Sequence, residues 1–382
     1  MTVFDIAIIG GGVIGTSIAF ELAAEKLRVL VLDRQQPGQE ASWAAAGMLS
    51  PAPDSQRDAT LVPLRRESLR LYPEFAARIE DASGQSIGYE REGTLELFSG
   101  PRGEHERNQR VSECKRWGIT AEAVAIKTAR AWENRIGQTA LAAAWMPEEG
   151  RIEPRLLMGA VIAAAQNRGV EFRENCPVTR LLTEQGRCEG IVAGNEKISA
   201  GHVILAAGCF SNEIGGDGQS RLPYVPTRPV RGQMVALRPN GFRLRRVLRS
   251  ERGYLVPRRD GQIVAGSTSE EAGFDKSVTA EGIRQILDRA LELVPSLGGA
   301  EIAETWSGLR PGTPDDLPIL GPAPMGGLLI ATGHYRNGIL LAAITAKLMR
   351  EWITMGRTSS ETRAFSPLRF QKPAFEAQHA GD

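Results

Sequence analysis

Three glycines near the start of the chain have the spacing of a phosphate-binding turn. Gly10, Gly12 and Gly15 form a G-x-G-x-x-G pattern that follows an apolar run. The pattern uses its glycines for a tight turn, for close approach of a pyrophosphate and for packing of the next helix on the strand. The amino terminus of that helix offers free N–H groups and a dipole that favour a negatively charged ligand.

An acidic residue follows at the distance that a dinucleotide-binding turn requires. Asp33 ends a second apolar run, where its carboxylate would accept hydrogen bonds from a ribose 2′-hydroxyl. Its charge disfavours a phosphorylated ribose, although Arg34 beside it weakens that argument. We expect a strand at Val3–Ile9, a helix at Thr16–Glu25 and a strand at Leu27–Leu32, which together form a βαβ unit. This unit alone fits both NAD and FAD.

Later segments are expected to return to the same parallel sheet. His202–Ala206 is predicted as a buried strand that ends at Ala207 and Gly208. Leu328–Ala331 is predicted as another strand, and a helix at Ile339–Trp352 follows it. A nicotinamide dehydrogenase usually keeps its cofactor domain in one continuous run. A cofactor domain assembled from separate segments therefore favours the longer FAD.

Helical spacing of apolar residues predicts three further helices. They are expected at Glu67–Ala82, with a kink or break at Pro73, at Pro154–Arg168 and at Val278–Leu293. Short strands separated by turns are expected at Met234–Leu237, Tyr254–Pro257 and Gln262–Ala265, and they predict a second, β-rich domain.

Composition excludes several classes of protein. The 382 residues carry 46 Lys+Arg against 45 Asp+Glu, which argues against a dedicated nucleic-acid binder. Cys114, Cys176, Cys188 and Cys209 form no C-x-x-C pair and no metal-like spacing with histidine, so we expect no metal site and a reducing compartment. No apolar run is long enough for a membrane span, and we expect a cytoplasmic protein without a membrane partner.

Four segments carry a resemblance to a known family. They are residues 8–15, AAAGML at 44–49, WSGLRPGT at 306–313 and GHYRNGILL at 333–341. On these the chain resembles the D-amino-acid oxidase (DAO) superfamily of FAD-dependent oxidoreductases and, within it, the glycine oxidases. The resemblance covers nearly the whole chain and is weakest between Pro101 and Ala144. It implies non-covalent FAD and no covalent tether at a late cysteine, because no cysteine follows Cys209.

The resemblance implies an α/β fold with two interleaved domains. One is a Rossmann-like FAD-binding domain of the GR2 type, and the other is an inserted α+β substrate domain with an antiparallel sheet. We assign residues 1–85, 146–222 and 301–365 to the FAD-binding domain, 86–145 and 223–300 to the substrate domain, and 366–382 to a peripheral tail.

The resemblance also assigns the substrate site. Arg310 corresponds to the arginine that binds the substrate carboxylate, and a planar guanidinium grips a carboxylate with two charge-assisted hydrogen bonds. Tyr254 corresponds to a tyrosine whose hydroxyl meets the same carboxylate, and Arg336 to an arginine near flavin and substrate. Arg252 stands where some glycine oxidases have histidine, so it would favour a second acidic group on the substrate or point to solvent.

The remaining assignments concern the cofactor. Besides the glycine turn, the residues implied to hold FAD are Val13, Ile14, Asp33, Arg34, Ala41, Ser42, Ala46, Gly47, Met48, Val178, Ala207, Gly208, His334, Tyr335, Arg336, Asn337, Gly338, Ile339 and Leu340. The segment from His334 to Leu340 would lie under the isoalloxazine ring, and His334 is expected to touch flavin without serving as a catalytic base.

The activity implied is FAD-dependent oxidation of glycine, or of sarcosine or D-alanine, to an imine and then a 2-oxo acid. Dioxygen would reoxidise the flavin and yield hydrogen peroxide. The resemblance further implies a role in thiamine thiazole formation, contact with a thiazole synthase, and a homotetramer.

Three alternatives remain open. A sarcosine oxidase or a quinone-linked D-amino-acid dehydrogenase would share most of these features. An RNA-modifying FAD domain would use the local excess of arginine at positions 228, 231, 245, 246, 249, 252, 258 and 259. A flavin-binding module without catalytic activity is the third.

Overall fold

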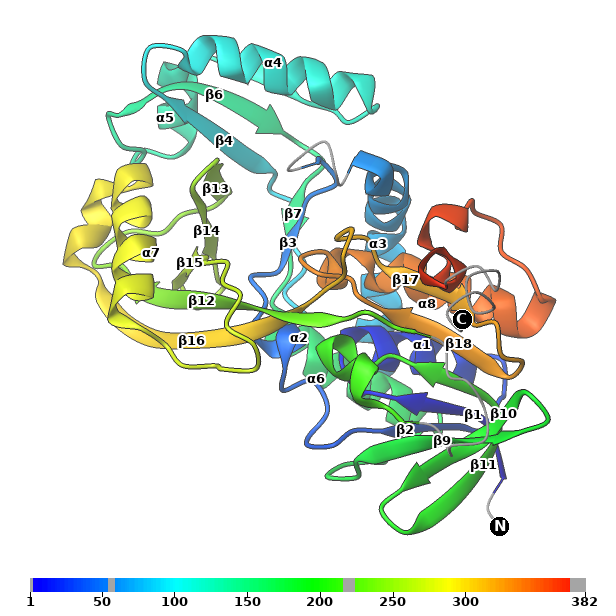
Figure 1. Ribbon diagram of the computed structural model, residues 1–382. Helices are drawn as coiled ribbons and strands as arrows, with labels where there is room; N and C mark the ends of the chain where they lie inside the picture. The colour runs from blue at the N-terminus through cyan, green and yellow to red at the C-terminus, as the bar shows by residue number, and fades with distance from the viewer. Residues whose placement is uncertain (1–2, 54–58, 216–223, 372–382) are drawn as a thin grey trace, which may run out of the picture.

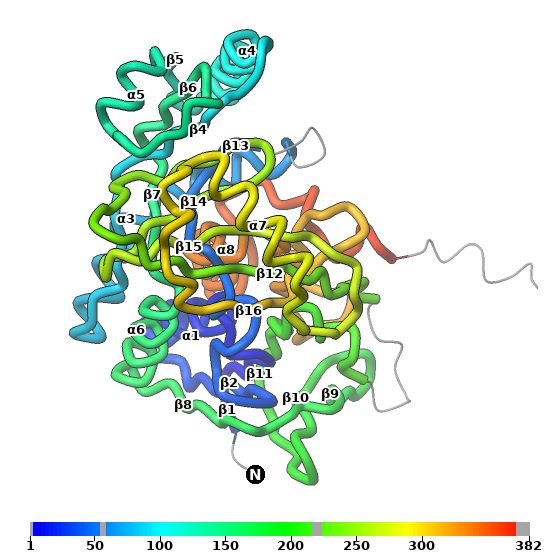
Figure 2. Tube along the Cα trace, turned by 90° about the vertical axis from the view of Figure 1, so that its left-hand side faces the viewer, coloured from blue at the N-terminus to red at the C-terminus, as the bar shows by residue number. Residues whose placement is uncertain are grey.

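A computed structural model describes residues 3–53, 59–215 and 224–371 of the chain (Figure 1). Its strands form two large sheets and one two-stranded ribbon, β3 (Met48–Leu49) with β7 (Gly150–Arg151). The first sheet occupies one end of the molecule, and the β4–β6 part of the second sheet projects at the opposite end (Figure 2). The ribbon and the long strands of the second sheet lie between these ends.

The first sheet is assembled from segments far apart in the chain. At its centre β1 (Val3–Ile9) lies parallel to both β2 (Val29–Leu32) and β11 (Glu196–Leu205). On either side β8 (Glu171–Arg173) and β18 (Leu328–Thr332) continue the parallel order. Antiparallel pairing adds β17 (Ile319–Pro322) at the edge beside β18, and β9 (Val178–Glu184) and β10 (Arg187–Ala193) beside β11.

Four helices build the main core over this sheet. They are α1 (Val13–Ala23), α3 (Val62–Ser83), α6 (Pro154–Asn167) and α8 (Gly338–Met355). Their apolar side chains and those of β1 and β2 form one buried cluster. α1 is buried along its whole length, because α6 and α8 pack on either side of it.

The break expected at Pro73 does not occur, since α3 continues through it. The proline faces solvent, whereas its neighbour Tyr72 is buried and donates a hydrogen bond to the Ile339 carbonyl oxygen at 3.1 Å. Ser68 donates likewise to the Leu340 carbonyl oxygen. Packing against α8 therefore outweighs the helix-breaking tendency of one proline.

The second sheet has the order β16-β12-β15-β14-β13-β4-β6-β5. Its first half comprises β16 (Glu301–Gly312), β12 (Arg228–Arg238), β15 (Ile263–Gly266), β14 (Gly253–Pro257) and β13 (Val247–Ser250). Its second half comprises β4 (Thr94–Ser99), β6 (Ala140–Met146) and β5 (Glu122–Val124). Helix α7 (Ala280–Leu293) packs on one face, while α4 (Gly103–Arg116) and α5 (Ile126–Trp132) accompany β4–β6.

The long strand β16 bears on the domain assignment. Its residues 301–312 pair with β12 along their length, so they lie in the second sheet, although they begin the third FAD-binding segment in our assignment. The strands β4, β5 and β6 and the strands β12–β15 of residues 223–300 also lie in that sheet. We therefore propose the same two-domain division with the last boundary moved to the end of β16.

Two further observations concern the chain as a whole. Within the described residues, no helix combines the length and the apolar character needed to cross a membrane. All four cysteines are free thiols, and the residues described contain no cluster of three His, Cys, Asp or Glu side chains that would hold a metal.

Candidate active site

One cavity of about 1460 Å³ lies between the two sheets. It is larger than the roughly 300–1,000 Å³ of a pocket for one drug-sized ligand, so it has room for a dinucleotide and a small substrate. Every residue predicted for the cofactor and substrate lines this cavity, except Gly15. The structure thus brings together segments from the beginning, middle and end of the chain.

The glycine turn between β1 and α1 explains that exception. Gly15 faces the turn itself, and a Cβ there would overlap the Gly10 carbonyl oxygen. Gly10 has φ +105°, and its Cβ would lie 2.5 Å from the Ala206 carbonyl oxygen. Gly12 differs, because a Cβ there would meet only the Ser42 hydroxyl at 3.3 Å. Two glycines therefore serve packing, and Gly12 keeps space clear in front of the α1 amino terminus.

The α1 amino terminus has the character of an anion site. Gly12 is its N-cap and supplies no side-chain hydrogen bond. The Val13 N–H donates instead to Ser42 Oγ at 2.9 Å, a contact from α2 (Ala41–Ala44). An 11-residue helix with its amino end at the cavity wall offers its dipole to a pyrophosphate.

Asp33 is oriented by the backbone around it. Its Oδ2 accepts from the Gly11 N–H at 2.8 Å and its Oδ1 from the Gln35 N–H at 3.0 Å. Burial raises the pKa of this carboxyl, and the two N–H bonds oppose the rise. The carboxylate is thereby fixed at the end of β2, where it can accept ribose hydroxyls.

Buried contacts also fix residues 46–48, which form another part of the cavity wall. Gly47 has φ +83°, and a Cβ there would overlap the Ile152 carbonyl oxygen. Arg258 donates to the Ala46 carbonyl oxygen at 2.8 Å, and burial lowers the pKa of its guanidinium to about 10. These contacts hold the 46–48 segment beside the cavity.

The last part of the wall is the turn before α8. The Tyr335 N–H donates to the Pro311 carbonyl oxygen at 3.0 Å, which ties this turn to β16. Asn337 caps α8 and Gly338 begins it, so the amino end of an 18-residue helix faces the cavity. Such an end stabilises negative charge on a bound group.

His334 in this turn lines the cavity and is held by a hydrogen bond to α8. It is 2% exposed, and its Nε2 lies 3.0 Å from Thr345 Oγ1 on α8. Burial lowers the pKa of this imidazole to about 3, so the ring stays neutral at ordinary pH. A neutral ring bonded to Thr345 agrees with the expectation that it is not the catalytic base.

This pKa predicts a pH dependence of stability. An unfolded histidine gains a proton below about pH 6.5, whereas folded His334 stays neutral down to about pH 3. The unfolded state then binds more protons, so the free energy of unfolding falls as the pH falls through this window. We expect His334 to account for about 2 kcal/mol of lost stability at pH 5. Urea unfolding at pH 7.5 and 5 should show this loss in the wild type and not in His334→Gln; equal losses would contradict it.

Arg310 lies where β16 meets the cavity. Its Nη2 donates to Ser267 Oγ at 2.7 Å, and its Nη1 donates to the Thr268 carbonyl oxygen at 3.2 Å. No acidic side chain among the described residues pairs with it, and burial lowers the pKa of its guanidinium. The Arg310 guanidinium lies against Gly232 on the paired strand β12. It fits there only because Gly232 has no side chain, since a Cβ at that position would overlap it.

The other two substrate residues lie beside the same cavity. Tyr254, on β14, is half-buried, and its hydroxyl contacts Met234 Sδ at 3.5 Å. Arg336 donates to Ser269 Oγ at 3.3 Å, and its guanidinium lies 5.2 Å from the centre of the Tyr335 ring. Two arginines and one tyrosine, from three separate elements, thus line the same cavity.

A charged wall that sequence reasoning missed closes the cavity near Met48. Arg249 on β13 donates to Glu96 Oε2 at 2.7 Å, to Glu149 Oε2 at 3.2 Å and to Ser50 Oγ at 2.7 Å. Arg110 on α4 also reaches Glu96 Oε2, at 3.1 Å. These residues come from five distant segments, and no local motif marks them.

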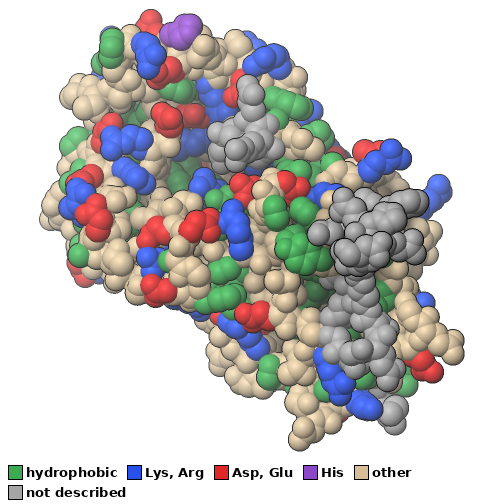
Figure 3. Space-filling view, in the orientation of Figure 1, with side chains coloured by type: hydrophobic (Ala, Val, Ile, Leu, Met, Phe, Trp, Pro, Cys, Tyr) green, Lys and Arg blue, Asp and Glu red, His purple; other side chains and the backbone are tan. Residues whose placement is uncertain are grey.

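Six of the eight arginines in the arginine-rich segment are ion-paired within the described part of the chain, all except Arg245 and Arg258. Its pairs are Arg228 with Glu271, Arg231 with Glu270 and Asp275, Arg246 with Glu133, Arg249 with Glu96 and Glu149, Arg252 with Glu292, and Arg259 with Glu90. On the face drawn in Figure 3, basic and acidic side chains alternate. This pairing reduces the local excess of positive charge on which the RNA-modifying alternative rests.

Comparisons with known proteins agree with this geometry. Residues 5–352 match the family described as FAD dependent oxidoreductase (DAO). The chain is 39% identical, over 97% of its length, to the bifunctional protein ThiO/ThiG of Trichormus variabilis. It spans 56% of that protein, about half its length. It is 34% identical to the glycine oxidase of Geobacillus kaustophilus, with 96% of this chain and 97% of that protein covered.

The fold comparison gives the same result. The crystal structure of glycine oxidase from Geobacillus kaustophilus superposes with a TM-score of 0.90 at 30% identity, covering 97% of this chain and 100% of that one. The expected α/β fold with a Rossmann-type FAD-binding region is thereby confirmed.

Proposed function

The chain belongs to the FAD dependent oxidoreductase (DAO) family, and on this premise we propose that it oxidises glycine with FAD and dioxygen. Glycine loses two electrons and becomes the imine, which water converts to glyoxylate and ammonia. Dioxygen takes the two electrons and two protons and becomes hydrogen peroxide. The glycine oxidases among its relatives support the choice of substrate.

The observation that carries this proposal is the state of Arg310. A guanidinium enclosed by protein, without an acidic partner among the described residues, is unfavourable unless a ligand supplies the negative charge. Ser267 and Thr268 accept hydrogen bonds from the Arg310 guanidinium, and the Arg310 side chain lines the cavity. A substrate carboxylate fits this requirement.

The residues present also fit FAD. Gly12 leaves room for a pyrophosphate, Asp33 presents a fixed carboxylate to a ribose, and the amino ends of α1 and α8 both face the cavity. When bound, FAD supplies the two-electron acceptor for the substrate α-carbon.

The chain itself binds and orients the substrate in this proposal. Arg310 on β16 grips the carboxylate, and the Tyr254 hydroxyl on β14, with β12 and β15 between the two strands, restricts its rotation. The amine loses its proton to solvent before oxidation, because the buried His334 stays neutral and bonded to Thr345. Catalysis then rests on orientation.

The charged wall favours a small substrate with one carboxylate. Glu96 and Glu149 already pair with Arg249, and Glu96 also with Arg110, so both guanidinium groups of this wall are engaged by protein carboxylates and a second substrate carboxylate would have to compete with them. Arg252, the residue that departs from the family, lines the cavity, but its side chain is 64% exposed and is ion-paired with Glu292 at 3.0 Å. We therefore propose that it does not select a second acidic group.

The proposal predicts a ranking of substrates. Glycine, sarcosine and D-alanine should bleach the flavin absorbance anaerobically, and on admission of air they should release one peroxide per imine. Iminodiacetate, which adds a second carboxylate, should have a kcat/KM at least tenfold below that of sarcosine. If no amino acid bleaches the flavin absorbance, the proposal is overturned. Bleaching without release of peroxide would indicate the dehydrogenase alternative.

The relatives also support two proposals about partners. In bifunctional ThiO/ThiG proteins, a region similar to this chain is about half of a longer polypeptide. We propose on this basis that the imine product serves thiamine thiazole formation and that a thiazole synthase is the partner. The homotetramer remains a proposal from family resemblance, which sedimentation of the purified protein would test.

A further inference from the structure

The loop between β15 and α7, residues 267–279, connects the substrate end of the cavity with its dinucleotide end. It leaves the second sheet at Ser267 and Thr268, which accept the hydrogen bonds from Arg310. It then passes along β12 and β16 (Figure 1). We call this segment the 267–279 loop.

Several contacts fix the middle of this loop. Arg231 on β12 pairs with Glu270 at 2.6 Å and with Asp275 at 2.5 Å. Ser307 on β16 donates to the Lys276 carbonyl oxygen at 2.5 Å. The tip of the loop, residues 274–276, is therefore held in place by both long strands.

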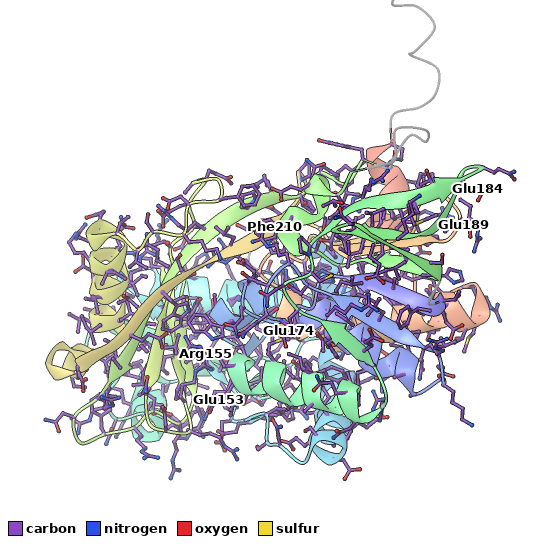
Figure 4. All side chains as sticks on the ribbon, turned by 90° about the horizontal axis from the view of Figure 1, so that it is seen from below. Glu153, Arg155, Glu174, Glu184, Glu189 and Phe210 are labelled. Carbon is purple, nitrogen blue, oxygen red and sulfur yellow. The ribbon has the colours of Figure 1, made fainter. Side chains whose placement is uncertain are left out.

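The tip makes two contacts with the FAD-binding side. The Phe274 ring stacks on the Phe210 ring, with 5.1 Å between centroids and 20° between planes. Lys276 Nζ lies 2.7 Å from Glu40 Oε2. Figure 4 labels Phe210, which belongs to the 3₁₀ turn at Gly208–Glu213 beside β12 and β16.

Both contacts converge on Arg34. The Arg34 guanidinium lies 3.4 Å from the centre of the Phe210 ring, and its Nη2 lies 2.9 Å from Glu40 Oε1. Arg34, Glu40 and Phe210 line the cavity, whereas Phe274 and Lys276 stand behind them. Arg34 directly follows Asp33, the acid expected at the ribose of the AMP half.

Phe274 is 47% exposed, although it is a large apolar side chain fixed in position. Its ring completes a stack of guanidinium, Phe210 and Phe274, in which each layer limits the movement of the next. We propose that Phe274 and Lys276 are positioning residues for FAD, which hold Phe210 and Arg34 at the adenosine end and slow release of the cofactor. This inference rests on the FAD binding in the proposed function.

The test measures FAD and ADP binding by the full-length protein. Phe274→Ala should raise the Kd for FAD about five- to tenfold, from loss of one aromatic contact and a weakened cation–π contact. The Kd for ADP, which carries the adenosine and the diphosphate but no flavin, should rise by the same factor. Phe274→Tyr keeps the stack and should restore both constants to within twofold of wild type.

Trp132→Ala is the matched control. Trp132 is 37% exposed, packs 5.3 Å from Trp145 and lies 5.3 Å from the Arg246 guanidinium, but it does not line the cavity. Its loss should leave both constants within twofold of wild type. The inference is overturned if Phe274→Ala stays within twofold of wild type, if Trp132→Ala weakens binding equally, or if FAD binding falls while ADP binding does not. A wild type that binds FAD without reduction by amino acids would refute the proposed activity while leaving these constants measurable.

Discussion

Arg310→Ala is expected to lower kcat/KM for glycine by about three orders of magnitude. Removing one partner of a buried, hydrogen-bonded charge pair costs about 2–5 kcal/mol, and each 1.36 kcal/mol is tenfold in rate. The substrate would also lose the bond that orients it, so kcat should fall along with the rise in KM. Peroxide release at varied glycine concentration measures both constants.

Arg310→Lys is the matched control because it keeps the charge and loses the planar fork. We expect it to retain part of the activity, about tenfold to a hundredfold below wild type. Both variants should purify with FAD, because the Arg310 contacts to Ser267 and Thr268 lie at the substrate end. Acetate should perturb the flavin spectrum of the wild type and not of Arg310→Ala. Near-normal kcat/KM in Arg310→Ala would refute the carboxylate assignment.

Gly12→Ala is expected to weaken FAD binding about a hundredfold with little effect on the apoprotein. A methyl group there meets only the Ser42 hydroxyl, at 3.3 Å, so the fold can accommodate it. The same methyl occupies the space in which the pyrophosphate must approach the backbone. FAD titration of the apoprotein gives the Kd, and urea unfolding should show a change below about 1 kcal/mol.

Gly15→Ala should behave in the opposite way. Its methyl would overlap the Gly10 carbonyl oxygen inside the turn, so the apoprotein itself should lose about 2–4 kcal/mol of unfolding free energy. Comparison of the two variants distinguishes a glycine that is needed for ligand binding, Gly12, from a glycine that is needed for folding, Gly15. If Gly12→Ala lowers apoprotein stability as much as Gly15→Ala does, Gly12 is a packing residue and its assignment to the pyrophosphate fails.

Local sequence was sufficient to predict the part of the site whose residues lie close together in the chain. The glycine turn, its two strands and Asp33 lie within about 30 consecutive residues, so spacing alone indicated their arrangement. The Arg310 assignment required family resemblance. Its place in a long β-strand was not evident, because Pro311 and Gly312 suggest a loop, whereas pairing with β12 makes this segment the end of β16.

The parts that sequence could not supply depend on contacts between distant segments. The charged wall joins Ser50, Glu96, Arg110, Glu149 and Arg249, and nothing near any one of them indicates the others. Phe274 lies in a polar loop, and its partner Phe210 belongs to the 3₁₀ turn at Gly208–Glu213, more than 60 residues earlier in the chain. The break expected at Pro73 failed for the same reason, since packing of α3 on α8 decides the helix.

The assembly of the first sheet from β1, β11 and β18 has a consequence for synthesis on the ribosome. The glycine turn emerges early, but the turn before α8, which completes the same cavity, is made about 320 residues later. At about 5–20 residues per second, the nascent chain spends roughly 15–65 s before that segment exists. During this time α1 lacks its cover from α8 and β11 lacks β18, so apolar surface and an open strand edge are exposed. Incomplete chains should therefore need chaperones, and the complete flavin site can form only after the turn before α8 has been made.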